Sequence, residues 1–350
     1  MKAARFHRHG PPPVLQYEDA PDPLPSPGRA IVRVHACALN HLDLWERRGI
    51  ERVPIPLPHI SGSDVAGEVV EARGGDVAAG TRVMLQPGLA CGTCEACRAG
   101  RDNLCASYDV LGLLSDGGYA EYVSVPVENL IPIPDHVGFV EAAAFPLTFL
   151  TAWHMLVTLA GVKAGDTVLV LAGGSGVGQA AIQIARLFGA RVLATAGPAK
   201  LDRTKALGAE EVFDHYAGDY SRNVKALTAG RGADIVVEHV GRATWDRSVR
   251  SLARGGRLVT CGATTGADGA LNLQHLFARQ LQVFGSYMGE KRELLAAAPL
   301  LFEGRLRPVV DQVLPLSDAA AAHERLEAHE QFGKIVLVAG GTGTRSAPSN

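Results

Sequence analysis

The chain has 350 residues, a formal net charge of −2, 47% hydrophobic residues and 20% charged residues. This composition is typical of a globular protein and argues against disorder, and the length predicts two domains. Because there is no basic surplus to neutralise phosphates, we do not expect nucleic-acid binding. Residues 1–9 contain no apolar stretch that would act as a secretory signal, so we expect a cytoplasmic protein.

One uncharged segment, residues 142–162, is long enough to span a bilayer. It contains Pro146, three threonines and His154, and it ends at Lys163. Because it is the single segment of this kind, we interpret it as a buried core helix and expect no membrane partner.

The N-terminal third is predicted to be rich in β-strands. Residues 30–36, 66–72 and 119–125 show the alternation or the β-branched runs of strands, and clusters of proline and glycine separate them. We therefore expect a first, β-rich domain over residues 1–134.

Strands and helices alternate from about residue 163 onward. β-rich runs begin near residues 167, 191, 211, 234, 257 and 281, with helical patterns between them. Gly189, Gly208 and Gly230 stand where the intervening helices should end. This alternation predicts an α/β domain over residues 135–290, with a doubly wound parallel sheet of the Rossmann type. The Gly/Ser/Thr-rich residues 340–350 are predicted to be disordered.

A glycine-rich loop joins the first of these strands, residues 167–172, to the helix 179–188. A P-loop would need Lys and Ser/Thr where Gln179 and Ala180 stand, and a nucleophile elbow would need glycine at Val177. Glycines between a buried strand and a helix let the backbone approach a pyrophosphate. The residues expected to hold the pyrophosphate are Gly173, Gly174, Ser175, Gly176 and Val177.

The residues that follow the second strand of this series bear on whether the cofactor is NAD(H) or NADP(H). It ends at Ala196-Gly197, where an NAD-specific site usually has an acidic residue for the ribose hydroxyls, and Lys200 follows. The missing carboxylate and the nearby cation favour NADP(H). The alternative is that Lys200 is a solvated lysine at the start of a helix.

Four cysteines with the spacing C-x2-C-x2-C-x7-C lie within residues 91–105. Four thiolates can close a tetrahedral zinc site and leave no position for a substrate, so the pattern predicts one structural zinc ion. An iron–sulfur cluster or four cysteines without metal are the alternatives. The expected ligands are Cys91, Cys94, Cys97 and Cys105.

Taken together, these features resemble the medium-chain dehydrogenase/reductase superfamily over nearly the whole chain. The β-rich domain, the cysteine lobe 91–105, the loop 173–178 and the closing residues 332–337 carry the resemblance. It implies that a GroES-like first domain binds the substrate and that the Rossmann domain binds the nicotinamide cofactor. It also implies that residues 291–339 return to the first domain.

The resemblance implies further cofactor contacts, at the ends of later strands and near the C-terminus. Tyr216 would flank the adenosine and Lys334 the pyrophosphate, although either residue could be an ordinary surface side chain. The remaining residues expected in the pocket are Val240, Gly241, Cys261, Gly262 and Ala263.

Zinc alcohol dehydrogenases of this superfamily carry a second, catalytic zinc ion, and here its usual ligands are replaced. Asn40 takes the place of the cysteine, Ser63 the place of the histidine, and the third place falls near Leu147. None of these is a good zinc ligand, so we expect no catalytic zinc. His41 and His59 lie close in sequence and could rebuild a metal site, although packing or hydrogen bonding is the commoner role of such histidines.

Asn40 and Asp43 together resemble the zinc-free quinone oxidoreductase branch. The resemblance implies hydride transfer from NADPH to a quinone or an α,β-unsaturated carbonyl. The Asn40 amide and the Ser63 hydroxyl would polarise the substrate oxygen, and Asp43 would orient Asn40. The alternatives are an alcohol or aldehyde dehydrogenase with a rebuilt metal site and a non-enzymatic NADPH-binding protein. The resemblance also implies that the sixth strand, residues 281–285, pairs with its twin, so we expect a homodimer or a homotetramer.

Overall fold

The computed structural model describes residues 1–339, and the predicted disordered tail lies outside them. The described residues form two compact units, one of residues 1–147 with residues 307–339 and one of Thr148–Leu306. The sequence predicts domain boundaries after residues 134 and 290, which lie 13 and 16 residues before the divisions between these compact units. The difference at the second division is the helix α10 (Lys291–Phe302), which stays with the second unit because Glu293 bonds the buried His154 there.

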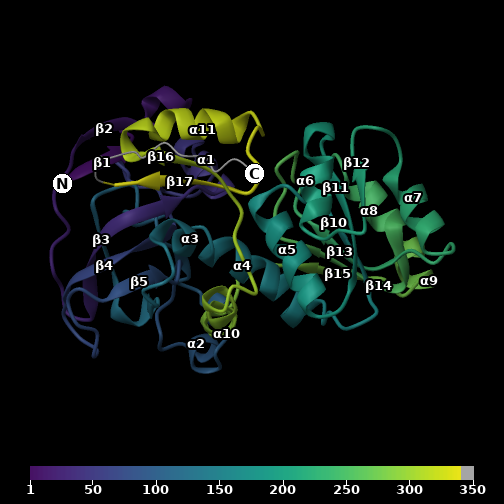
Figure 1. Cartoon of the computed structure of the whole chain (residues 1–350), viewed down its shortest axis with the longest axis horizontal. Helices are drawn as coiled ribbons and strands as arrows, with labels where there is room; N and C mark the ends of the chain where they lie inside the picture. Colours follow the sequence, from purple (N-terminus) through teal and green to yellow (C-terminus); the bar gives the residue numbers. More distant parts are fainter. Residues whose placement is uncertain (340–350) are drawn as a thin grey trace. The chain divides into compact units, whose positions relative to one another are not determined.

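The first unit is built on a seven-stranded sheet with the order β16-β17-β3-β4-β5-β9, and β8 pairs with β3 as well (Figure 1). Its strands are β1 (Lys2–Arg5), β2 (Gln16–Asp19), β3 (Arg29–Ala38), β4 (Asp64–Ala72), β5 (Arg82–Leu85), β6 (Gly88–Leu89), β7 (Asp109–Val110), β8 (Tyr122–Pro126), β9 (Leu130–Pro132), β16 (Val310–Pro315) and β17 (Lys334–Val338). Its helices are α1 (His41–Arg48), α2 (Glu95–Arg98), α3 (Phe139–Ala143) and α11 (Ala319–Glu327), and α4 (Pro146–Trp153) begins in it. Alternation in β3 buries Ala30, Val32 and Val34 in the core of this unit.

The end of the chain completes this sheet. β17 pairs antiparallel with β3, with Val336 opposite Ala38 and Val338 opposite Ala36. This register brings Lys334, at the start of β17, toward Asn40, at the end of β3. Two segments almost 300 residues apart in sequence therefore meet at one end of the sheet.

The second unit is a six-stranded sheet with the order β12-β11-β10-β13-β14-β15, and every neighbouring pair is parallel. Its strands are β10 (Thr167–Val170), β11 (Arg191–Ala196), β12 (Glu211–Asp214), β13 (Ala233–Glu238), β14 (Leu252–Thr260) and β15 (Gln282–Gly285). Its helices are α5 (Gly176–Leu187), α6 (Leu201–Ala206), α7 (Tyr220–Leu227), α8 (Trp245–Ser251), α9 (Leu273–Ala278) and α10. This strand order is that of the dinucleotide-binding fold, so the predicted Rossmann-type sheet is confirmed.

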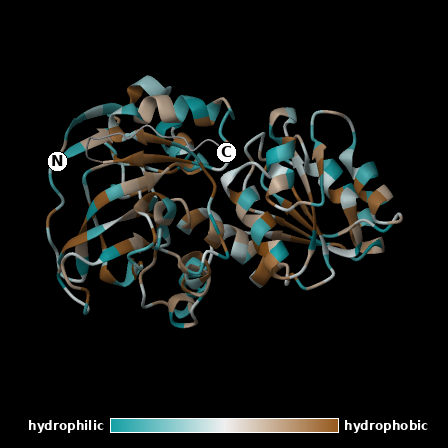
Figure 2. Cartoon of the chain, in the orientation of Figure 1, coloured by the Kyte–Doolittle hydropathy of each residue, from teal (hydrophilic) through white to brown (hydrophobic). Residues whose placement is uncertain are grey.

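Helices cover both faces of this second sheet, with α5 and α6 on one side and α7 and α8 on the other (Figure 1). The strands between them are strongly hydrophobic, and the helices carry hydrophilic residues on their outer sides (Figure 2). Gly189, Gly208 and Gly230 all have positive φ, of 74°, 106° and 83°, at the ends of α5, α6 and α7. The three predicted glycine caps are confirmed.

The uncharged segment 142–162 is buried over most of its length, as predicted. It is divided, however, because α3 ends before Pro146, and α4 passes into a π-helix over His154–Leu159. Within residues 1–339, no helix has both the length and the apolar character needed to cross a membrane.

Candidate active site

The parallel sheet places those predicted cofactor residues that belong to the second unit at a single edge. Each of them follows the carboxyl end of a strand: the glycine loop after β10, Lys200 after β11 and Tyr216 after β12. Val240 and Gly241 follow β13, and residues 261–263 follow β14. Because the carboxyl ends of parallel strands share one edge, these residues surround the crevice where such sheets bind dinucleotides.

The glycine loop forms a tight turn into α5. Ser175 is the N-cap of α5, and its Oγ accepts a hydrogen bond from the Gly178 amide at 2.9 Å. The amides of Gly176 and Val177 have no acceptor in the part of the chain that the structure describes. A Cβ at Gly178 would lie 2.3 Å from the Ala172 carbonyl oxygen, so only glycine allows the strand and the helix to approach this closely. The loop therefore fits a pyrophosphate, which would accept from the unpaired amides.

Lys200 and Tyr216 lie near Gly197 together with a residue that the sequence analysis missed, His215. A Cβ built on Gly197 would lie 3.6 Å from the Tyr216 ring and 4.0 Å from His215 Nε2. Burial, together with the positive charges of Arg247 and Lys200, lowers the pKa of His215. The imidazole is therefore neutral and its Nε2 faces the end of β11. No local sequence pattern marks His215, because the pairing of β11 with β12 is what places it there.

The loop after β13 is fixed by the buried carboxylate of Glu238, another residue missed by sequence reasoning. It accepts from the amides of Val240 at 2.7 Å and Gly241 at 3.1 Å, and from the Thr244 hydroxyl at 3.0 Å. Gly241 has a φ of 93°, and a Cβ there would lie 2.9 Å from the Ala263 Cα. The loops after β13 and β14 thus touch, and burial raises the pKa of the Cys261 thiol to about 12.

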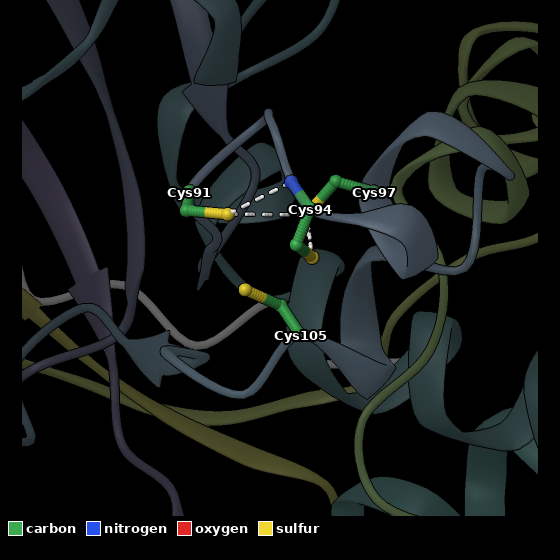
Figure 3. A group of neighbouring side chains, drawn as sticks. All are labelled: Cys91, Cys94, Cys97 and Cys105. Carbon is green, nitrogen blue, oxygen red and sulfur yellow. Dashed lines mark hydrogen bonds between the residues drawn. The ribbon is translucent and has the colours of Figure 1, made fainter.

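The four cysteines of residues 91–105 converge in the first unit, and Figure 3 shows their sulfur atoms directed toward one another. All four sulfurs lie within 4.8 Å of one another, with Cys91 and Cys97 3.9 Å apart and Cys94 and Cys97 3.4 Å apart. Tetrahedral zinc–thiolate bonds of about 2.3 Å place sulfurs about 3.8 Å apart, so the set fits a zinc ion. Hydrogen bonds from Thr93 lower the pKa of Cys91 to about 6, whereas burial and the neighbouring cysteines raise the pKa of Cys97 to about 12.

Asn40, Asp64 and Lys334 form a buried group at the end of β3. The Lys334 ammonium donates to Asn40 Oδ1 at 2.6 Å and to Asp64 Oδ2 at 2.9 Å, and Asn40 Nδ2 donates to Asp64 Oδ2 at 2.9 Å. The Leu147 amide donates to the other Asp64 oxygen at 2.7 Å. Both polar atoms of the Asn40 side chain therefore have partners inside the protein, and Lys334 is only 2% exposed.

Asp43 lies beneath this group on α1 and is completely buried. Its Oδ2 accepts from the Asn40 amide at 2.9 Å and from the Tyr119 hydroxyl at 2.7 Å, and His323 lies 3.2 Å beyond that hydroxyl. Burial raises the pKa of Asp43 to about 6 and lowers the pKa of His323 to about 3. Asp43 thus fixes the backbone at Asn40 rather than facing an open site.

Ser63 is fully buried, and its hydroxyl has no hydrogen-bond partner within the described residues. The two histidines nearby in sequence, in contrast, both contact other residues. His59 Nε2 lies 2.6 Å from the Gly112 carbonyl oxygen and its ring packs against Phe6, while His41 stacks on His329. Among residues 1–339, the four cysteines are the one cluster of metal-binding side chains.

Comparison with known proteins identifies the family. A family model described as an alcohol dehydrogenase GroES-like domain matches residues 26–135, and one described as a zinc-binding dehydrogenase matches residues 176–303. A quinone oxidoreductase of Pongo abelii is 31% identical over 97% of this chain and 98% of its own length. The chain belongs to the zinc-containing medium-chain dehydrogenase/reductase superfamily. Within this superfamily it is quinone oxidoreductase-like, and it is an NAD(P)H-dependent oxidoreductase.

Other members of the superfamily are also similar to the chain. An alcohol dehydrogenase of Geobacillus stearothermophilus is 31% identical over 96% of this chain and 99% of its own length. A solved structure described as a NAD-dependent alcohol dehydrogenase is 49% identical, with a TM-score of 0.94, over 97% of this chain and 100% of its own. Proteins described as quinone oxidoreductases and proteins described as alcohol dehydrogenases are thus both similar to this chain. The residues of the site have to distinguish between these two activities.

Proposed function

We propose that the protein transfers a hydride from NADPH to a quinone or an α,β-unsaturated carbonyl without a catalytic metal ion. The observation that carries this proposal is the donor set at the end of β3. The three positions that would ligate zinc hold Asn40, Ser63 and Leu147, and a buried ammonium already bonds Asn40 and Asp64. A fixed cation at this point would repel a divalent ion, so these residues do not fit a catalytic zinc.

Hydride transfer to a quinone or to an α,β-unsaturated carbonyl requires little activation of the acceptor. NADPH supplies the hydride, which adds to the β-carbon of an enone or to a quinone, and the electron pair of the π system moves onto the oxygen. The resulting enolate or phenolate needs hydrogen-bond donors, and the unpaired Ser63 hydroxyl is one. Asn40 serves to hold Lys334 rather than to polarise the substrate, because its amide already donates to Asp64. A proton from solvent completes the reduction.

The residues around Gly197 support NADPH as the cofactor. Ala196 and Gly197 offer no carboxylate to a ribose 2′-hydroxyl, while Lys200 and His215 can meet a 2′-phosphate. The glycine loop would hold the pyrophosphate. The structural relative described as NAD-dependent makes the choice between the two cofactors a demanding test.

Two further assignments belong to the proposal. The cysteine lobe holds one structural zinc ion, because its four thiolates close the coordination sphere. The chain forms a homodimer through β15, which lies at the edge of its sheet and exposes Val283. Pairing two such edges around a two-fold axis would cover both.

Initial rates of NADPH oxidation with a benzoquinone, an enone and an aliphatic aldehyde test the proposed activity. We expect the quinone or the enone to be the best acceptor, and Ser63→Ala to lower kcat by about a hundredfold, as loss of one oxyanion donor does. Ser61→Ala is the matched control, because Ser61 is equally buried and two residues away. A strong preference for the aldehyde, with activity lost on chelation while the melting temperature is unchanged, would support an alcohol dehydrogenase with a metal instead.

A further inference from the structure

The buried ammonium of Lys334 has no role of its own in the hydride transfer described above. Its two acceptors, Asn40 Oδ1 and Asp64 Oδ2, lie at 2.6 and 2.9 Å, and both partner residues are themselves buried. Burial of a charged amine is costly unless it is paired and hydrogen-bonded. A lysine held in this way stands at a fixed place in the first unit.

Asp64 is already saturated by its neighbours. One oxygen accepts from the Leu147 amide, and the other accepts from both Asn40 Nδ2 and Lys334. A carboxylate with these partners is held firmly as the counter-ion. The ammonium, in contrast, has three N–H donors, and toward the described residues 1–339 it uses two of them. Its third N–H points away from both acceptors because the nitrogen is tetrahedral.

We propose that Lys334 is a catalytic residue whose third N–H stabilises the oxyanion formed on the substrate, in the role that the zinc ion has elsewhere in the superfamily. This inference rests on the proposed function. Lys334 lies against Asn40, at the first of the three positions that would otherwise ligate zinc, and Asp64 directly follows Ser63, at the second.

The resemblance to the superfamily suggested another role for Lys334, a contact with the cofactor pyrophosphate. In the structure the ammonium makes two short hydrogen bonds inside the first unit. Movement of Lys334 to a pyrophosphate would leave the Asp64 carboxylate buried without its counter-ion, which is strongly unfavourable. The two roles therefore exclude each other and predict opposite effects on cofactor binding.

The step balances without any further reactant. The hydride forms a bond to the β-carbon, the C=C electrons form the enolate, and NADPH becomes NADP⁺. The enolate oxygen accepts hydrogen bonds from Lys334 and Ser63, and Lys334 keeps its proton while the α-carbon is protonated from solvent. An enolate is more basic than the phenolate formed from a quinone, so the enone depends more on the ammonium.

The test is Lys334→Met, which keeps most of the side-chain volume and removes the charge. A second variant, Lys334→Met with Asp64→Asn, removes both charges and so leaves no unpaired carboxylate if the single variant folds poorly. Arg47→Met is the matched control, because Arg47 is a fully buried cation of the same unit that pairs with Glu327. The dissociation constant of NADPH is measured by fluorescence, and hydride transfer is measured in single turnovers with an enone and with a quinone.

We expect NADPH affinity to change less than twofold in all three variants. Hydride transfer to the enone should fall by about a hundredfold or more in both Lys334 variants, with a smaller loss for the quinone, while Arg47→Met leaves both rates unchanged per folded molecule. A tenfold loss of NADPH affinity would assign Lys334 to the pyrophosphate and overturn the inference. Equal loss with both acceptors would overturn it too, because a merely structural residue does not distinguish them. Wild-type protein inactive toward both acceptors would instead refute the proposed function.

Discussion

The pH dependence of stability is the sharpest physical consequence of the buried Asp43. Burial raises the pKa of this carboxyl to about 6, even though the Asn40 amide and the Tyr119 hydroxyl donate to it. In the unfolded chain its pKa is about 3.9. Because the folded protein prefers the protonated form, Asp43 lowers the free energy of unfolding as the pH rises from below 4 to above 6.

The size of the effect follows from linkage between the two pKa values. The raised pKa of Asp43 lowers the free energy of unfolding by about 1 kcal/mol at pH ~4.5 and by about 3 kcal/mol at pH ~7.5. The destabilisation therefore grows by about 2 kcal/mol between these two pH values. Asp43→Asn removes this term and keeps an oxygen for both donors. The variant should therefore gain about 2 kcal/mol relative to wild type over this interval.

Urea unfolding of both proteins at the two pH values measures the difference directly. Asp135→Asn is the control, because the Asp135 side chain is fully exposed and its loss should shift the free energy of unfolding equally at both pH values. If wild type and Asp43→Asn differ by the same amount at both, Asp43 is ionised throughout and the reasoning from burial is refuted.

The remaining predictions concern the metal, the cofactor and the oligomer. Purified protein should contain one zinc per chain by elemental analysis, and Cys105→Ser should lose the metal and several degrees of melting temperature while turnover per folded molecule persists; two equivalents of zinc, or iron, would contradict this. Lys200→Ala should reduce the ratio of kcat/KM for NADPH to kcat/KM for NADH by about tenfold to hundredfold, since a charge-assisted contact contributes about 1.5–3 kcal/mol. The control Lys205→Ala should leave this ratio unchanged. If Lys200→Ala weakens the use of both cofactors equally, Lys200 does not bind the 2′-phosphate. Light scattering at micromolar concentration should give the mass of a dimer, and Val283→Lys should give that of a monomer; a monomeric wild type would rule out pairing through β15.

The parallel sheet could be predicted in detail because its signals are local. Each strand of the second unit is a short apolar run, and glycines with positive φ end the helices between them. The glycine loop could likewise be recognised from its place between β10 and α5. The division between the units was less accessible, because α10 joins the second unit through a bond between His154 and Glu293, which are 139 residues apart.

The centre at the end of β3 shows the same contrast. Asn40 and Ser63 could be singled out because they replace known ligands at expected spacings. The partnership of Lys334 with Asn40 spans 294 residues, and it depends on the pairing of β17 with β3. No spacing rule encodes such a pair. His215 and Glu238 were missed for the same reason, since pairing between strands and a turn in the backbone place them.

The group around Asp64 also sets an order of events during synthesis. Its members come from the end of β3, from residue 147 and from the start of β17, so the whole second unit, residues 148–306, leaves the ribosome before Lys334 does. The second unit can fold as its own domain while the first still lacks two strands of its sheet, β16 and β17. A nascent chain that stops short of residue 334 can thus acquire its Rossmann fold but not its buried cation. Of the strands in residues 1–339, the last to be made is β17, which completes the centre at Asp64.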